Sequence, residues 1–183
     1  MKIVVIGNVA TGKTSLCVRW AHGTFTDHYK ATVGVDFVVK GDCQLWDVAG
    51  QERFGAVTAS FYRASHGALV VLDWTCARAV ENAEKWILDY QQKYTDGTPI
   101  LIMANKADLP GRVCVEDMDA LCKRHEALIG WVATSAKTGA GVHEAIDQLI
   151  ECARAETVKE DGKDNVIKLR EKQEEYDDFD KCC

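Results

Sequence analysis

Short apolar runs alternate with amphipathic stretches along most of the 183 residues, and this alternation restricts the fold more than any other feature. The runs are β-branched or aliphatic and cover Ile3–Ile6, Phe37–Val39, Cys43–Trp46, Ala68–Leu72, Ile100–Met103 and Trp131–Thr134. Between them, apolar residues recur at spacings of three and four within Thr14–His22, Val80–Tyr94, Val115–His125 and Val142–Ala155. The pattern predicts an α/β fold with about six strands, mostly parallel, and about five helices covering both faces.

One connection is too short to hold a helix. Phe37–Lys40 and Cys43–Trp46 are separated only by the pair Gly41-Asp42. A two-residue link of this type is typical of a tight hairpin turn. We therefore expect one antiparallel strand at the edge of the sheet.

A glycine-rich segment joins the first strand to the first helix. Gly7–Thr14 satisfies the pattern GxxxxGK[ST] in the strand–loop–helix context that a phosphate-binding P-loop requires. Backbone N–H groups and the helix N-terminus would face the phosphates, Lys13 would reach the β- and γ-phosphates, and the Thr14 hydroxyl would bind Mg²⁺. Taken alone, the motif could also be a chance glycine turn. The residues predicted to contact nucleotide here are Gly7, Val9, Ala10, Thr11, Gly12, Lys13, Thr14 and Ser15.

A carboxylate follows the strand Cys43–Trp46. Asp47 opens the segment Asp47–Glu52, and the carboxyl ends of parallel strands meet at the same edge of a sheet. Asp47 is therefore predicted to lie near the P-loop and to hold the metal, through a water molecule.

Two polar tetrapeptides each follow a separate strand. They are Asn105-Lys106-Ala107-Asp108 and Thr134-Ser135-Ala136-Lys137, at the positions where such sheets carry ligand-binding loops. Either one alone could be an ordinary polar loop. Their occurrence together, in order and downstream of a P-loop, predicts a base-binding site.

The chemistry of the two loops fits guanine. The Asp108 carboxylate can accept from both N1–H and the 2-amino group, which adenine cannot offer, and a site built on hydrogen bonds rejects the analogue that lacks them. Asn105 can bond the N7 side and the Ala136 N–H can bond O6, while the alkyl stems of Lys106 and Lys137 cover the ring. Ser135 completes the predicted base-site set.

Composition excludes several classes. The net charge is −6 without a block of like charges, which gives no reason to expect nucleic-acid binding. Eight cysteines include six isolated ones without a CxxC motif, which we expect to be reduced. The first apolar run is too short for a signal peptide or membrane span.

We expect a GTPase domain over residues 1–155 and a flexible, charged tail over 156–183 that ends in Cys182-Cys183.

Residues 2–155 carry a series of motifs in this order: GNVATGKT, Thr32, WDVAGQE, NKAD and TSAK. Together these motifs resemble the Rab branch of the Ras superfamily. Rab-like signatures also stand at residues 33–37, 52–54 and 61–64. The resemblance implies that Thr32 completes the Mg²⁺ shell, Gly50 meets the γ-phosphate, Gln51 orients the attacking water and Phe25 stacks on guanine. The lipid anchor that it implies is a prenyl chain on each of Cys182 and Cys183.

Other residues carry finer implications of the same resemblance. Phe37, Trp46 and Phe61 look like the aromatic triad that Rab proteins show to effectors, although core packing explains them equally well without the family context. His28–Thr32 together with Val48 looks most like the subgroup that serves lysosome-related organelles.

The resemblance implies a switch in intracellular vesicle trafficking that binds GTP or GDP with Mg²⁺ and hydrolyses GTP slowly. A monomer is expected in the cytosol and on the cytoplasmic face of an intracellular membrane, with an exchange factor, an activating protein, an escort protein and effectors as partners. A GTP-loaded binding module with little hydrolysis is the alternative. A P-loop kinase or ATPase is disfavoured because it would not need Asp108 and its partner loop.

Three features depart from the Rab pattern. Val9-Ala10-Thr11 replaces a small residue, Gly and Val in the P-loop. The segment from Asp36 to Trp46 is several residues shorter than usual, so its hairpin must be a stub, and either a genuine short hairpin or an error in the gene model would explain it. The tail is acidic and offers no electrostatic attraction to anionic lipid.

Overall fold

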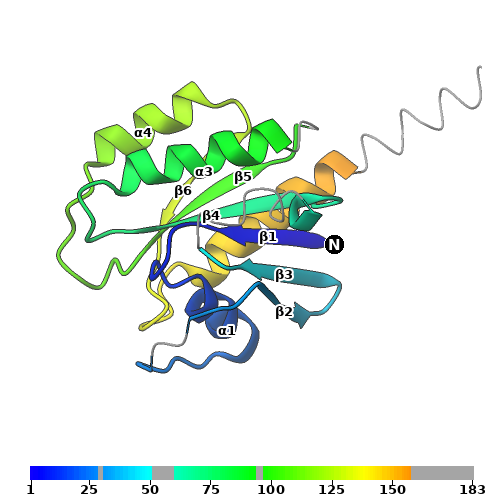
Figure 1. Cartoon of the computed structure of the whole chain (residues 1–183), viewed down its shortest axis with the longest axis horizontal. Helices are drawn as coiled ribbons and strands as arrows, with labels where there is room; N and C mark the ends of the chain where they lie inside the picture. The colour runs from blue at the N-terminus through cyan, green and yellow to red at the C-terminus, as the bar shows by residue number, and fades with distance from the viewer. Residues whose placement is uncertain (29–30, 51–59, 94–96, 158–183) are drawn as a thin grey trace, which may run out of the picture.

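The structure is a computed structural model of the whole chain, and it describes residues 1–28, 31–50, 60–93 and 97–157. Within these ranges a sheet with the strand order β2-β3-β1-β4-β5-β6 forms the centre (Figure 1). The strands are β1 (Lys2–Ile6), β2 (Val35–Lys40), β3 (Cys43–Val48), β4 (Gly67–Asp73), β5 (Ile100–Asn105) and β6 (Leu128–Ala133). The helices are α1 (Lys13–His22), α3 (Ala79–Lys93), α4 (Val115–Arg124) and a C-terminal helix over residues 142–157. The predicted α/β fold is confirmed.

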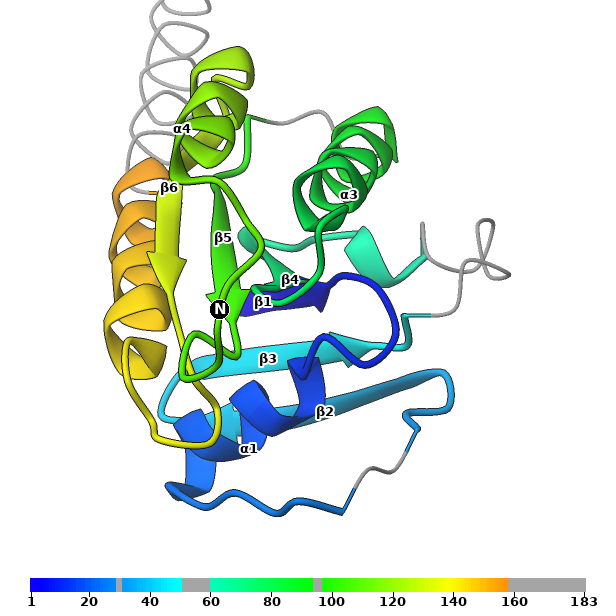
Figure 2. The ribbon, with the colours of Figure 1, turned by 90° about the vertical axis from the view of Figure 1, so that its left-hand side faces the viewer.

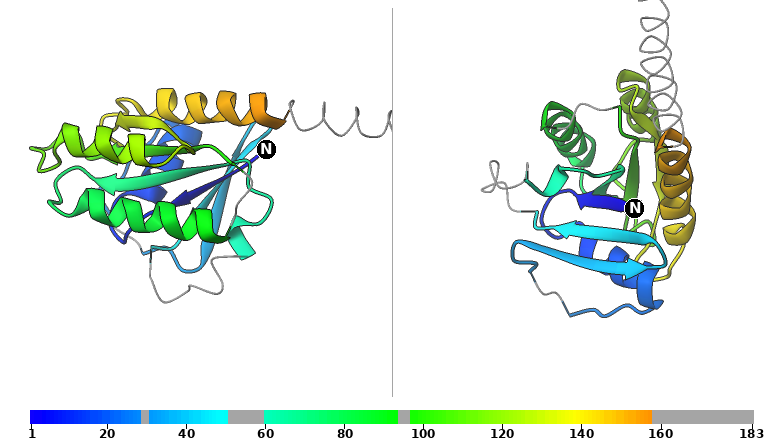
Figure 3. Two further views of the ribbon diagram at one scale, coloured as in Figure 1. Left: turned by 90° about the horizontal axis from the view of Figure 1, so that it is seen from above. Right: turned by 90° about the vertical axis from the view of Figure 1, so that its right-hand side faces the viewer.

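Helices cover both faces of the sheet. In Figures 2 and 3, α3 and α4 lie on one side and α1 and the C-terminal helix on the other. Side chains of a strand point alternately to the two faces. Ile3 and Val5 accordingly pack under α1 and the C-terminal helix, while Val4 and Ile6 pack under α3 and α4. The two apolar layers explain why the strands read as nearly continuous hydrophobic runs.

The strand directions place five carboxyl ends at one edge of the sheet. β1 pairs in parallel with β3 and β4, and β5 pairs in parallel with β4 and β6. The loops that follow β1, β3, β5 and β6 therefore meet at this edge, where open α/β sheets bind ligands.

The predicted hairpin is present. β2 and β3 pair antiparallel, with Phe37 opposite Trp46 and Lys40 opposite Cys43, so that only Gly41 and Asp42 form the turn. β2 is the edge strand of the sheet. The short connection closes in register, and the stub hairpin is compatible with an intact sheet.

The last strand differs from its predicted range. β6 begins at Leu128 instead of Trp131, and Thr134 lies beyond its end at Ala133. Opposite β5 the register is irregular, with Ile100 facing Leu128 and Leu101 facing Gly130. Glycine weakens a strand, which is why the sequence pattern placed the start after Gly130. Pairing with β5 overrides that local preference.

The six isolated cysteines, all within the described residues, form no disulfide bond with one another, and Cys17 and Cys43 are buried, as expected for reduced thiols. Among the residues that the structure describes, no helix has the length and apolarity to cross a membrane. The C-terminal helix is described through residue 157. Cys182 and Cys183 lie outside the described residues, and so does Gln51.

Candidate nucleotide-binding site

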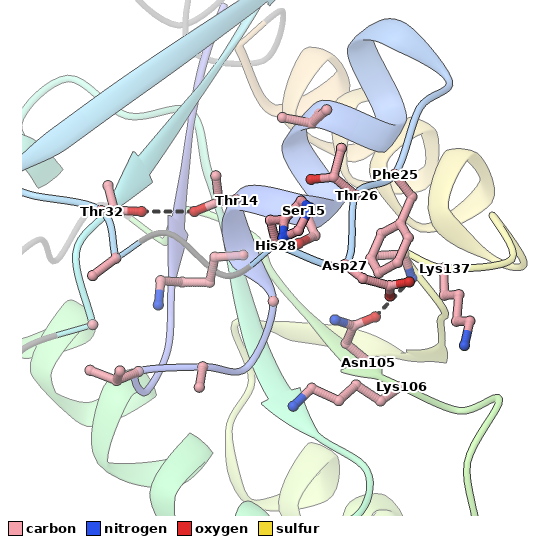
Figure 4. A pocket seen from close by; sticks show the side chains of 18 of the residues that line it. Thr14, Ser15, Phe25, Thr26, Asp27, His28, Thr32, Asn105, Lys106 and Lys137 are labelled. Atoms are coloured by element: carbon pink, nitrogen blue, oxygen red, sulfur yellow. Dashed lines mark hydrogen bonds between the residues drawn. The ribbon is translucent and has the colours of Figure 1, made fainter.

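A cavity of about 630 Å³ lies at the edge of the sheet where the loops meet (Figure 4). This volume suits a small-molecule ligand. The structure brings the predicted phosphate and base residues together around it. Those that line the cavity are Val9, Ala10, Gly12, Lys13, Thr14, Ser15, Phe25, Thr32, Gly50, Asn105, Lys106, Asp108, Ala136 and Lys137. Four other predicted residues do not line the cavity but are hydrogen-bonded to residues that do, as described below: Gly7, Thr11, Asp47 and Ser135.

Lys13 is held beneath the P-loop. Its Nζ donates to the carbonyls of Gly7 and Asn8, both at 2.9 Å, and the residue is 7% exposed. Burial lowers the pKa of this ammonium, while the nearby Asp47 carboxylate acts in the opposite direction. A phosphate group in the loop would provide the anionic partner that a buried ammonium needs.

The P-loop packs directly against the base loop at Gly12. This residue has φ +92°, and a Cβ atom there would lie 2.3 Å from the Asn105 Nδ2 atom. A side chain at position 12 would therefore meet both backbone strain and a clash with Asn105. Only glycine allows the two loops to approach this closely.

Gly50 meets the other side of the P-loop. A Cβ atom at position 50 would lie 2.6 Å from both the Asn8 carbonyl carbon and the Val9 nitrogen. The segment after β3 thus reaches the phosphate loop, and the contact of Gly50 with the γ-phosphate stays a prediction.

Three oxygen-bearing side chains gather beside the P-loop. The Thr14 and Thr32 hydroxyls lie 2.8 Å apart (Figure 4), and both donate to Asp47 Oδ2, at 2.5 and 3.2 Å. The second oxygen, Asp47 Oδ1, is buried and has no hydrogen-bond partner among the described residues. Burial raises the pKa of Asp47, against the hydrogen bonds from Thr14 and Thr32 and the charge of Lys13.

This cluster fits a hard divalent cation. Mg²⁺ prefers oxygen ligands and is usually shared between one or two protein groups and substrate phosphates. A cation would also compensate the buried Asp47 carboxylate, whose Oδ1 has no partner within the part of the chain that the structure describes. Thr14, Thr32 and Asp47 are thus chemically suited to Mg²⁺, and their role as its ligands stays a prediction.

Asn105 joins the two base loops to the P-loop. Its Nδ2 donates to the Thr11 carbonyl at 2.8 Å, and its Oδ1 accepts from the Ala136 N–H at 3.0 Å. The Asp108 Oδ1 accepts from the Ser135 hydroxyl at 2.7 Å, which orients the exposed carboxylate. The Asn105 amide and the Ala136 N–H are also the groups predicted to contact guanine. Each would have to bind the base in addition to the hydrogen bonds that already hold the loops.

Two further contacts near the cavity escaped the sequence analysis. Lys106 Nζ is 2.6 Å from Asp73 Oδ2, and Trp86 Nε1 in α3 donates to Asn8 Oδ1 at 2.6 Å. Asp73 ends β4 at the same edge of the sheet, which is a signal that could have indicated its role. The position of Trp86 within a helix carries no comparable signal.

Two of the three predicted effector-face aromatics form one surface unit. The rings of Phe37 and Trp46 stack with centroids 6.0 Å apart, and Phe37 is 58% exposed. Phe61 is half-buried against the apolar layer under α3 and α4. A residue that served only to pack the core would be buried, so core packing alone does not explain the exposed Phe37 ring.

Comparison with known proteins gives the family. The model of the Ras family matches residues 2–155. The chain belongs to the Ras family. Three curated relatives are Rab proteins. Ras-related protein Rab-32A of Dictyostelium discoideum is 39% identical over 82% of this chain and 76% of its own length. Ras-related protein Rab-7L1 of Homo sapiens is 39% identical over 82% and 80%. Ras-related protein Rab-32 of Sus scrofa is 37% identical over 100% and 88%.

The predicted resemblance to Rab proteins is confirmed. The relatives named Rab-32 agree with the subgroup that the sequence favoured. As a Rab protein of the Ras superfamily, the chain is a GTP-binding small GTPase of vesicle trafficking. The cavity at the carboxyl edge of its sheet is accordingly the candidate site for the nucleotide.

Proposed function

We propose that this Rab protein is a guanine-nucleotide switch that hydrolyses GTP slowly and recruits effectors in its GTP state. One observation carries the proposal: a single cavity joins the P-loop and the Thr14–Thr32–Asp47 oxygen cluster to the loops of Asn105 and Ala136. A triphosphate with a guanine base has chemistry that matches both ends of this cavity.

The base end would select guanine. Asp108 accepts from N1–H and the 2-amino group, and the Ser135 hydroxyl keeps its carboxylate oriented. Phe25 is half-buried beside the cavity and supplies an aromatic face, while the stems of Lys106 and Lys137 cover the ring. Adenine would leave the Asp108 carboxylate unpaired, which is costly in a site built on hydrogen bonds.

The phosphate end would bind the triphosphate. Lys13 would exchange the Gly7 and Asn8 carbonyls for the β- and γ-phosphates. Thr14, Thr32 and Asp47, the last through a water, would hold Mg²⁺, which neutralises charge on the β- and γ-phosphates when bound. Because Thr32 belongs to the segment that precedes β2, its hydroxyl would be free to leave after the γ-phosphate is lost, and this is the proposed switch.

Hydrolysis transfers the γ-phosphoryl group of GTP to water and yields GDP and inorganic phosphate. Gln51 is the proposed residue that orients the water, and Lys13 stabilises charge on the phosphates. Val9 lines the cavity and is 51% exposed. Its branched side chain is stiff at χ1, so we propose that it hinders Gln51 and makes turnover slow.

A GTP-loaded binding module with little or no turnover is the second candidate function, and the position of Val9 favours it. Both candidates share every proposed binding residue. The test is single-turnover hydrolysis of preloaded GTP at saturating Mg²⁺, with and without an activating protein. Measurable phosphate release that an activating protein accelerates supports the switch. Intact GTP in both reactions supports the module.

The remaining parts of the proposal concern partners and location. The stacked pair Phe37 and Trp46 would face effectors. An exchange factor, an activating protein and an escort protein would act on a monomer. Prenyl chains on Cys182 and Cys183 would attach the protein to the cytoplasmic face of an intracellular membrane, because the acidic tail cannot provide a second membrane signal.

A further inference from the structure

We propose that Arg19 is a positioning residue that holds both walls of the base pocket and thereby sets how long a guanine nucleotide stays bound. The inference rests on the proposed guanine site. Arg19 lies in α1, does not line the cavity, and is not among the residues that any motif singled out.

One guanidinium group serves three backbone carbonyls. Arg19 Nε donates to Ala136 O at 2.8 Å, Nη2 donates to Lys137 O at 2.7 Å, and Nη1 donates to Gly23 O at 2.5 Å. The guanidinium is planar and always charged, and its donors are fixed in a fork. Charge-assisted hydrogen bonds of this kind are roughly twice as strong as neutral ones.

The first two bonds orient the loop that would bind the oxygen of guanine. In a trans peptide, the C=O and the following N–H point in opposite directions. When Arg19 holds the carbonyls of Ala136 and Lys137, it directs the N–H groups that follow them away from α1. On the other side, the Ala136 N–H is held by Asn105 and the Thr138 N–H by the Ser135 hydroxyl. The loop is thus fixed from both sides.

The third bond reaches the opposite wall of the pocket. Gly23 caps the C-terminal end of α1, and its N–H donates to the Arg19 carbonyl at 2.9 Å. The chain then continues to Thr24 and Phe25, which line the cavity. Arg19 therefore ties the segment that carries the stacking aromatic to the loop of Ala136.

A simpler role does not account for the geometry. A basic residue in the last turn of a helix is favourable because it faces the negative end of the helix dipole. That role explains the bond to Gly23 but not the two bonds to the loop more than a hundred residues later in the chain.

The test measures release of a fluorescent GDP analogue from the full-length chain and from Arg19→Lys and Arg19→Ala. Lysine keeps the charge but lacks the fork, so it cannot serve three carbonyls. Both variants are expected to release GDP on the order of tenfold faster, because charge-assisted hydrogen bonds are lost. Arg154→Ala is the matched control, since Arg154 pairs with Asp42 on the surface.

A second measurement separates positioning from general loosening. 6-Thio-GDP replaces O6 by sulfur, which is a poorer hydrogen-bond acceptor. Arg19→Lys should accelerate its release less than that of GDP, whereas a merely structural lesion would accelerate both equally and lower the melting temperature of the nucleotide-free protein. Arg19→Lys should also accelerate GDP release by the same factor in Mg²⁺ and in EDTA, because the substitution affects the base end of the site and not the phosphate end.

The outcomes distinguish this inference from the proposed function. If the unmodified protein does not retain GDP, the guanine site itself is wrong. If it retains GDP and both Arg19 variants release it at the unmodified rate, or release GDP and 6-thio-GDP with equal acceleration, the positioning role of Arg19 is overturned.

Discussion

Asn105 accepts a hydrogen bond from the Ala136 N–H at 3.0 Å, although Asn105 ends β5 and Ala136 follows β6. The same Asn105 side chain donates to Thr11 in the P-loop at 2.8 Å and is 2% exposed. A buried amide that is satisfied on both sides rigidifies the groups it connects. The phosphate loop and the two base loops are therefore held as one unit.

Thr14→Asn should weaken GTP binding more than GDP binding. The change removes a hydroxyl that lies 2.8 Å from Thr32 and also contacts Asp47, and so removes a proposed Mg²⁺ ligand next to the phosphates. Equilibrium titration of both nucleotides at several Mg²⁺ concentrations measures the effect. Thr14→Ser keeps the hydroxyl and is the matched control. Equal retention of GTP and GDP by Thr14→Asn would count against the metal role.

Val9→Ser and Val9→Gly should each raise the rate of intrinsic GTP hydrolysis. Turnover in this superfamily is on the order of 10⁻⁴ s⁻¹ without an activating protein, and Val9 lines the cavity on the P-loop side. Single-turnover assays at saturating Mg²⁺, with equal GTP loading of each variant, provide the comparison. No gain in either variant would show that Val9 is not the obstruction.

Protonation of Asp73 should lower the stability of the protein in acid. Burial opposes ionisation of this carboxyl, but hydrogen bonds from Lys106 and Thr75 outweigh it and hold the pKa of Asp73 below its usual value. Such a group stabilises the fold fully above its unfolded pKa of about 4, and this contribution is lost as the pH falls toward the folded pKa.

Asp73→Asn tests this pH dependence. The free energy of unfolding in urea should fall less steeply between about pH 5 and pH 3 in the variant than in the unmodified protein. The difference should stay below about 1 kcal/mol, since solvent screens a partly exposed pair. Glu81→Gln, in the exposed pair with Arg78, is the control. Parallel curves for Asp73→Asn and the unmodified protein would contradict the assignment.

Local sequence pattern was sufficient for the parts of the site that lie within one strand–loop–helix unit. Gly12 ends the loop between β1 and α1, Lys13 begins α1, and their motif has a fixed backbone form. Local sequence pattern was insufficient to predict contacts between distant segments, such as those of Trp86 with Asn8 and of Arg19 with Ala136. These depend on how the helices pack on the sheet, which no local spacing encodes.

Cys182 and Cys183 should each carry a geranylgeranyl chain. One chain gives marginal and reversible membrane binding and two give stable anchoring, at about 0.8 kcal/mol per buried CH₂. Intact mass of protein purified from cells should show two prenyl additions, and Cys182→Ser and Cys183→Ser should each show one and shift the protein toward the cytosol. An unmodified and wholly cytosolic protein would contradict the prediction.

Equilibrium competition between guanine and adenine nucleotides tests the central claim most directly. The unmodified protein should prefer GTP over ATP by roughly 10⁴ or more, because adenine leaves the Asp108 carboxylate unpaired. Asp108→Asn should move the preference toward xanthine nucleotides, whose 2-oxo group suits an amide, and Asp117→Asn, on the exposed surface of α4, should leave it unchanged. Comparable binding of ATP and GTP by the unmodified protein would contradict the account.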